Sequence, residues 1–211
     1  MKQILIVESS PRGEESTSRK LTRMVEKRLL EQYPEAKIIA RDLTADALPH
    51  LNRVVVNAIN RSDHAETAAL TNAVHRSDQL TSELLEADIV VIACPVWNFG
   101  IPSSLKAWID HVVRAGKTFK YTDSGAEGLA NNKKAILVIA SGAVFSEGPW
   151  RSWDYAEPYL RQIMNFIGIE DIQTIRAEGL NVPHLAEEAF GKGEKAVKAV
   201  IIERQEKCST I

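Results

Sequence analysis

The sequence predicts an α/β protein with a doubly wound parallel sheet, in which helices cover both faces of the sheet. Five short apolar runs of strand length alternate with longer stretches that have helical periodicity. Residues 3–7 and 89–94 are apolar at almost every position, which is typical of strands buried on both faces. This alternation favours parallel strands joined by right-handed crossovers.

The expected elements follow one another in a regular order. Strands are expected at residues 3–7, 37–41, 89–94, 134–140 and 171–177. Helices are expected at residues 17–32, 67–86, 155–167 and 185–206, and a further helix begins after Pro102. Residues 42–65 are irregular apart from a helical turn at 54–59, and residues 117–129 resemble an inserted hairpin. Because no linker or repeat interrupts the chain, a single domain over residues 1–211 is predicted.

Composition excludes several classes of partner. The 211 residues are 45% hydrophobic and 26% charged, with a formal net charge of −2 and no cluster of Lys and Arg. Neither nucleic acid nor a membrane is therefore expected as a partner. The first apolar run is too short for a signal peptide. Cys94 and Cys208 form no CxxC pair, so we expect free thiols and a cytoplasmic location.

Three loops should hold the functional site, because ligands of such sheets bind beyond the carboxyl ends of the strands. They cover residues 9–18, 95–102 and 140–149. The first loop is rich in serine and threonine and leads into a helix, an arrangement that suits a phosphate group. An ordinary capping loop at the surface explains the same residues equally well. No Walker A motif is present, which disfavours a nucleoside triphosphate.

The second and third loops offer aromatic side chains. Trp97 and Phe99 bracket Asn98, and these residues together with nearby backbone amides suit a flat ring with polar edges. The alternative is that both rings are simply buried. In the third loop, three further aromatic residues could form a pocket wall, core or dimer contacts: Phe145, Trp150 and Trp153.

The sequence contains no obvious catalytic side chain. The five histidines lack metal-ligand spacing, no GxSxG motif is present, and Cys94 is better explained as a small buried residue than as a nucleophile. No metal site is predicted. A phosphate cradle and a ring-binding loop without an acid–base pair indicate a phosphorylated redox cofactor that carries the chemistry itself.

Two motifs in residues 89–129 carry a family resemblance. The stretch reads IVVIACPVWNFGIPSSLKAWIDHVVRAGKTFKYTDSGAEGL. It resembles the FMN-dependent NADH:quinone oxidoreductases, also called azoreductases, of the flavodoxin-like fold, and the similarity extends along nearly the whole chain. The resemblance implies the strand order 2-1-3-4-5, one noncovalent FMN per subunit, and a homodimer with both active sites at its interface.

The resemblance also implies which residues form the site. The phosphate end of FMN should lie against Ser10, Ser16, Thr17 and Ser18. The isoalloxazine ring should lie against Val96, Trp97, Asn98 and Phe99, and a second flavin loop should consist of Ala140, Ser141, Gly142 and Ala143. The substrate pocket should include, partly across the dimer, Phe119, Tyr121 and Phe166. The family often has S-x-G-G in the second flavin loop, so the sequence A-S-G-A departs from the pattern there.

The implied function is a two-electron, ping-pong oxidoreductase. NADH or NADPH would reduce FMN, and a quinone or an aromatic azo compound would then be reduced, with flavin N5 and no side chain carrying the hydride. Two alternatives from other classes are an electron carrier of the flavodoxin type and a flavin-binding interaction module. Carriers tend to be shorter and strongly acidic. The sequence does not decide between the two nicotinamides or name the physiological acceptor.

Overall fold

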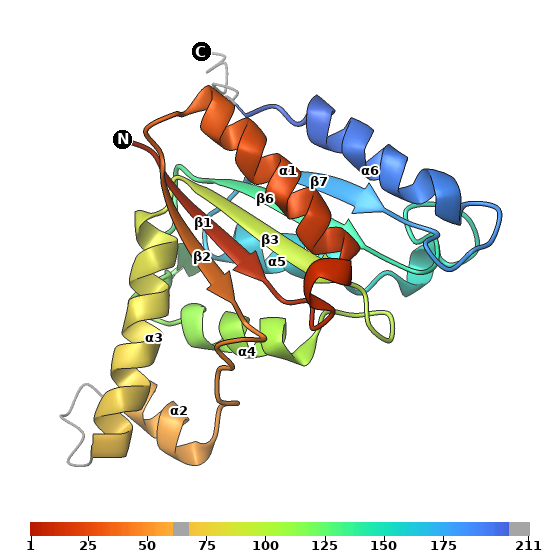
Figure 1. Ribbon diagram of the computed structural model, residues 1–211. Helices are drawn as coiled ribbons and strands as arrows, with labels where there is room; N and C mark the ends of the chain where they lie inside the picture. The colour runs from red at the N-terminus through yellow and green to blue at the C-terminus, as the bar shows by residue number, and fades with distance from the viewer. Residues whose placement is uncertain (61–67, 203–211) are drawn as a thin grey trace.

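The parallel sheet lies at the centre of the molecule. The structure is a computed structural model and describes residues 1–60 and 68–202. Within these residues, five parallel strands form one sheet in the order β2-β1-β3-β6-β7 (Figure 1). They are β1 (Gln3–Glu8), β2 (Lys37–Asp42), β3 (Ile89–Pro95), β6 (Lys134–Ala140) and β7 (Asp171–Ala177). This confirms the predicted fold class, and β6 and β7 are the fourth and fifth strands of the predicted order 2-1-3-4-5.

Helices cover both faces of this sheet (Figure 1). One face is covered by α1 (Thr17–Gln32) and α6 (Ala186–Ala199). The other face is covered by α3 (Ala68–Glu86), α4 (Ser103–Val112) and α5 (Glu157–Phe166), while α2 (Arg53–Asn60) packs against α3. Side chains of β1 alternate between the two cores, with Ile4 and Ile6 under α1 and with Leu5 and Val7 on the opposite face.

The central strands are the most deeply buried part of the fold. Every residue of β6 is buried, as are all residues of β3 except its last, Pro95. The edge strand β2 has no buried position. Full burial explains why β3 and β6 are apolar throughout, whereas an edge strand tolerates charged residues.

The hairpin expected at residues 117–129 is confirmed. It consists of β4 (Phe119–Thr122) and β5 (Gly125–Gly128), which pair antiparallel outside the main sheet. Two short 3-10 helices, η1 (Gly13–Glu15) and η2 (Arg151–Trp153), lie in the loops after β1 and β6.

Two predicted helix boundaries were wrong. The helix expected from residue 155 begins at Glu157, with Ala156 as its N-cap residue. The Asp154 carboxylate accepts hydrogen bonds from the backbone N–H groups of Ala156 and Glu157, which holds the chain in a turn just before the helix. The last helix ends at Ala199 rather than at residue 206. Val200 leaves the helix in an extended conformation and stays buried in the core, while the backbone N–H of Ile201 binds Gln173. Residues 203–206 lie outside the described part of the chain.

In the part of the chain that the structure describes, no helix is both long and apolar enough to cross a membrane. No group of three or more His, Cys, Asp or Glu side chains in the same residues could hold a metal ion.

Candidate functional site

A cavity of about 520 Å³ opens at the carboxyl ends of β1, β3 and β6. Its volume lies in the usual range for small-molecule sites, and its place is where doubly wound sheets bind ligands. Four segments line it: Ser10, Arg12 and Ser16–Ser18 after β1; Pro95–Asn98 after β3; Ala140–Gly142 after β6; and Leu180 with Asn181 after β7.

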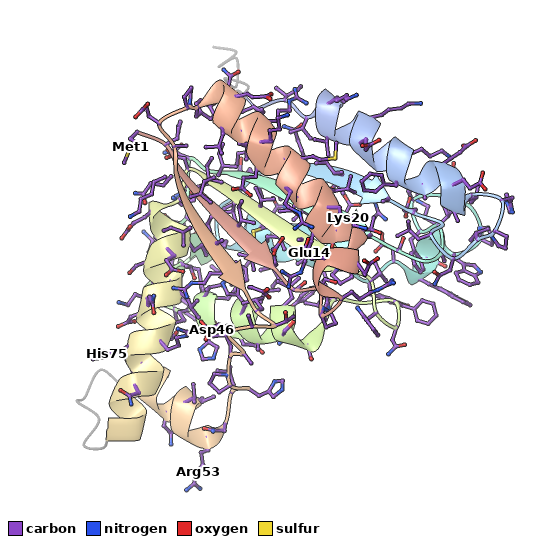
Figure 2. The ribbon with its side chains drawn as sticks, viewed as in Figure 1. Met1, Glu14, Lys20, Asp46, Arg53 and His75 are labelled. Carbon is purple, nitrogen blue, oxygen red and sulfur yellow. The ribbon has the colours of Figure 1, made fainter. Side chains whose placement is uncertain are left out.

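The first wall is the N-terminus of α1 and the loop before it (Figure 2, where Glu14 marks this end of the helix). Ser16 caps α1, since its hydroxyl accepts a hydrogen bond from the Arg19 backbone N–H at 3.4 Å and lies 3.1 Å from the Ser18 hydroxyl. The N–H groups of the first helical turn have no intrahelical acceptor. Hydroxyls and free N–H groups therefore face the cavity together, at the positive end of the helix dipole.

The second wall is a tight turn after β3. Trp97 and Gly100 exchange two backbone hydrogen bonds, with N···O distances of 3.0 and 2.9 Å. Asn98 and Phe99 between them have positive φ angles of 46° and 69°, as in the type I′ turns of hairpins. Their own N–H groups have no partner among the described residues, so they remain available to a ligand.

Aromatic rings surround this turn. The Phe99 ring meets Phe145 and Trp153 edge-on, with centroids 6.1 and 5.5 Å apart, and Trp150 stacks on Trp153 at 5.7 Å. Phe145 is buried, while Phe99 and both tryptophans are more than 40% exposed. The aromatic residues of the second and third loops therefore form one cluster beside the cavity.

The third wall pairs with the loop that follows β7. The backbone carbonyls of Ser141, Gly142 and Ala143 accept hydrogen bonds from the N–H groups of Leu180, Asn181 and Gly179. The Ser141 hydroxyl donates to the Ala143 carbonyl at 2.7 Å, so the displaced serine of this loop is used internally. A Cβ at Gly142 would lie 2.4 Å from Nδ2 of Asn181, so only glycine fits without moving that side chain.

A network of ion pairs and hydrogen bonds holds the loop that follows β6 in place. The Glu178 carboxylate accepts hydrogen bonds from the Phe145 and Ser146 N–H groups at 2.8 and 3.0 Å, and from Arg176 at 2.7 Å. Arg176 also binds the carboxylates of Asp154 and Glu157. The Arg176 guanidinium therefore holds this loop at two places, through Glu178 at Phe145 and directly at Asp154.

The cavity collects the predicted cofactor residues with two exceptions. All of them line it except Phe99 and Ala143, each of which follows a lining residue in the chain. Sequence reasoning missed Arg12, Pro95, Leu180 and Asn181. Arg12 is the cation of the serine-rich loop and could have been chosen for its charge. Asn181 carries no such signal in its own sequence, and the loop after the fifth predicted strand was not among the three loops expected to hold the site.

The predicted substrate residues lie apart from the cavity of their own chain. Phe119 contacts Tyr121 and Phe166 with centroid distances of 5.4 and 4.7 Å, forming a second aromatic cluster on the hairpin and α5. None of the three lines the cavity, and Tyr121 is 76% exposed. One chain therefore does not bring them to the cofactor residues.

Cys94 is a buried thiol behind the second wall. Its side chain is fully buried at the end of β3, and burial, helped by the charge of Asp154, raises its pKa to about 12. The thiol stays protonated at neutral pH, so the structure agrees with its interpretation as a small buried residue.

Fold and cavity together define a protein of the flavodoxin type. The family model described as having a flavodoxin-like fold matches residues 2–201. A protein of Beijerinckia indica named FMN-dependent NADH:quinone oxidoreductase is 56% identical over 96% of this chain and all of its own length. One of the same name from Rhizobium johnstonii is 44% identical over 96% of this chain and 99% of its own. The chain belongs to the flavodoxin-like family that these FMN-dependent NADH:quinone oxidoreductases represent.

Solved structures agree with this assignment. An azoreductase from Bacillus anthracis str. Sterne superposes with a TM-score of 0.87 at 35% identity, covering 94% of this chain and 98% of the other. An FMN-dependent NADH-azoreductase from Bacillus anthracis str. Ames Ancestor, solved in complex with FMN, gives a TM-score of 0.84 at 28% identity and covers 94% of this chain.

Proposed function

We propose that this chain is an FMN-dependent NAD(P)H oxidoreductase that works by two-electron, ping-pong turnover, reducing a quinone in one round and cleaving an aromatic azo compound in two successive rounds. The observation that carries the proposal is the cavity in which the serine-rich helix start, the 95–98 segment and the 140–142 segment meet. Relatives of similar length that are named for this activity support it.

The first wall fits the phosphate of FMN. Hydroxyls of Ser10, Ser16, Thr17 and Ser18 and the N–H groups of the first turn of α1 offer hydrogen-bond donors, and Arg12 adds a positive charge. These residues would hold the phosphate end.

The second and third walls fit a flat ring with polar edges. Val96, Trp97, Asn98 and Phe99 would line the isoalloxazine on one side, and Ala140, Ser141, Gly142 and Ala143 on the other. The unpartnered N–H groups of Asn98 and Phe99 are donors that a reduced, electron-rich ring requires. Glycine at 142 keeps that edge of the cavity open beside Asn181.

The chemistry needs no acid or base from the chain. When held by these residues, FMN would supply the redox chemistry, taking a hydride from NADH or NADPH and giving two electrons to the acceptor. The residues around it bind the phosphate, orient the ring and stabilise negative charge through backbone amides. The exposed rings of Phe99, Trp150 and Trp153 offer a flat apolar surface to an aromatic acceptor beside the cavity.

The active unit that we propose is a cytoplasmic homodimer of single-domain chains, residues 1–211, with one FMN per subunit. The support for a dimer is the second aromatic cluster, because Tyr121 exposes most of a large ring that one chain leaves unused. Phe119, Tyr121 and Phe166 would complete the substrate pocket of the partner.

Steady-state turnover tests the proposal. The flavin-loaded chain is assayed with NADH and with NADPH, using menadione, a benzoquinone and an azo dye as acceptors. Menadione-dependent oxidation of NADH at catalytic enzyme, with parallel double-reciprocal lines, is the expected result. Failure to bind FMN would refute the proposal. Binding without direct turnover would instead favour an electron carrier or an interaction module.

A further inference from the structure

Arg19 is a buried cation just behind the first wall of the cavity, where the FMN phosphate is expected; we call this wall the phosphate wall. It lies in the first turn of α1, three residues after the capping Ser16, and is 8% exposed. It does not line the cavity. A buried arginine must be satisfied by specific partners, so its contacts indicate what it holds in place.

The contacts of Arg19 join the loop after β1 to the carboxyl ends of β1 and β2. Nε and one terminal nitrogen of Arg19 donate to the Ser10 carbonyl at 3.1 and 2.9 Å. The guanidinium also binds the Glu8 carboxylate at 2.6 Å and the Asp42 carboxylate at 2.7 Å, at the ends of β1 and β2. Two hydrogen bonds from a planar group to one carbonyl fix the orientation of the Ser10 peptide.

The same contacts control the charge beside the cavity. The hydrogen bond from Arg19 is the main cause that holds the pKa of Asp42 well below its usual value. Burial raises the pKa of Glu8, and the Arg19 charge opposes that rise. Without Arg19, two carboxylates would stand at the end of the sheet where a phosphate dianion is expected, and would repel it.

We propose that Arg19 is a positioning residue that makes the cavity selective for the phosphorylated flavin without touching it. It orients the Ser10 segment and pairs with Glu8 and Asp42, so that the net charge of this group behind the wall is −1 instead of −2 and the phosphate is repelled less. This inference rests on the proposed function, since it presumes that FMN occupies the cavity.

The test compares two flavins that differ only in the phosphate. Full-length chain is stripped of flavin and titrated with FMN and with riboflavin, and quenching of flavin fluorescence gives each Kd. The variants are Arg19→Met and Arg19→Lys. Arg41→Met is the matched control, because Arg41 is also a largely buried arginine that binds carboxylates, Glu83 and Asp46. Within the described residues, its ion pairs do not involve the loop at residues 9–16.

The expected result is a loss of discrimination. Arg19→Met should raise the Kd of FMN about tenfold or more and that of riboflavin less than about twofold. Arg19→Lys keeps the charge, so its Kd for FMN should lie between those of wild type and Arg19→Met. Arg41→Met should leave the ratio of the two Kd values unchanged. If Arg19 had a purely structural role, Arg19→Met would weaken the binding of FMN and of riboflavin by the same factor. That outcome would overturn the proposal.

A second substitution tests the part that charge plays. Adding Glu8→Gln to Arg19→Met removes one of the uncompensated carboxylates and should recover at least threefold of the lost FMN affinity. No recovery would refute the electrostatic role. If wild type binds neither flavin, the proposed function fails; if it binds FMN tightly and Arg19→Met does so equally, only the role of Arg19 fails.

Discussion

At the scale of single residues, the cavity depends on small groups in exact backbone positions rather than on reactive side chains. Ser16 caps α1 and faces the cavity at the same time. Gly142 leaves space that the Asn181 amide occupies. Substitutions at these positions can therefore separate the stability of the fold from the affinity of the site.

Ser16→Asp should abolish tight FMN binding without unfolding the protein. Aspartate is as good an N-cap as serine, but Ser16 is only 2% exposed, so burying the new carboxylate should lower the thermal midpoint of the flavin-free chain by about 2–4 °C while the fold is kept. Its carboxylate faces the phosphate wall, and Kd for FMN should rise about tenfold or more. Calorimetry and fluorescence titration measure the two quantities. Equal FMN affinity in the variant would show that the phosphate lies elsewhere.

Gly142→Ala should weaken FMN binding because the new Cβ displaces the Asn181 side chain. Asn181 is exposed and free to move, so the cost falls on the site rather than on the fold. We expect Kd to rise about threefold to tenfold, and Asn181→Ala added to Gly142→Ala should recover most of it. Additive effects in this double-mutant cycle would contradict the predicted clash.

At the scale of elements, the sheet and α5 are tied to the third loop through charge. Glu157 begins α5 and contacts Thr174 and Arg176 of β7, while Arg176 reaches Glu178 and through it the Phe145 N–H. Burial raises the pKa of Glu157, but hydrogen bonds from Thr174 and Arg161 and the charge of Arg176 outweigh that effect and hold it below the usual value. Ionised Glu157 therefore stabilises the fold.

Glu157→Gln should destabilise the protein in a way that depends on pH. We expect a loss of about 1–3 kcal/mol at pH 7, because one buried partner of Arg176 loses its charge. A lowered pKa gives stability that is present above the unfolded value near 4.5 and is lost below it. The difference between variant and wild type in urea unfolding should thus shrink as pH falls from 6 to 3. The exposed Glu187→Gln is the control and should show no such trend.

The elements differ in how far the sequence predicts them. Strands β3 and β6 are buried along their length, apart from Pro95 at the end of β3, and their apolar runs predict them well. The end of α6 was missed because Val200 remains buried after the helix has ended, so hydrophobicity does not mark the boundary. The serine-rich helix start was expected to lie at the functional site, and its residues line the cavity. Asn181 was missed although the pairing of β6 with β7 was expected, because the backbone contact that brings its loop to Gly142 leaves no mark in the sequence.

At the scale of the whole molecule, the two aromatic clusters lie apart in one chain and would meet only between two subunits. Phe99 lies beside the cavity, and Tyr121 lies on the hairpin away from the cavity lining. The proposed dimer would bring the hairpin of one subunit to the cavity of the other. If the proposed dimer is symmetric, each active site would take its cofactor residues from one chain and Tyr121 from its partner.

Mixing two inactive variants tests this arrangement. Ser16→Asp impairs the cofactor wall and Tyr121→Ala the hairpin, so each variant alone should have low quinone reductase activity. Random heterodimers would hold one site with both defects and one intact site. Refolding an equal mixture with FMN should recover about a quarter of wild-type activity. Activity that does not exceed the average of the two variants would place Tyr121 in its own subunit's site or outside both.

The buried position of Cys94 matters for the chemical durability of an enzyme with quinone substrates. Quinones are electrophiles that alkylate thiolates by conjugate addition, and only an accessible, ionised cysteine reacts. Cys94 is the last residue but one of β3 and comes immediately before the segment that lines the cavity, but it is fully enclosed and burial raises the pKa of its thiol to about 12. The fold thus keeps a nucleophile one residue from the cavity lining while shielding it from arylation by the acceptor.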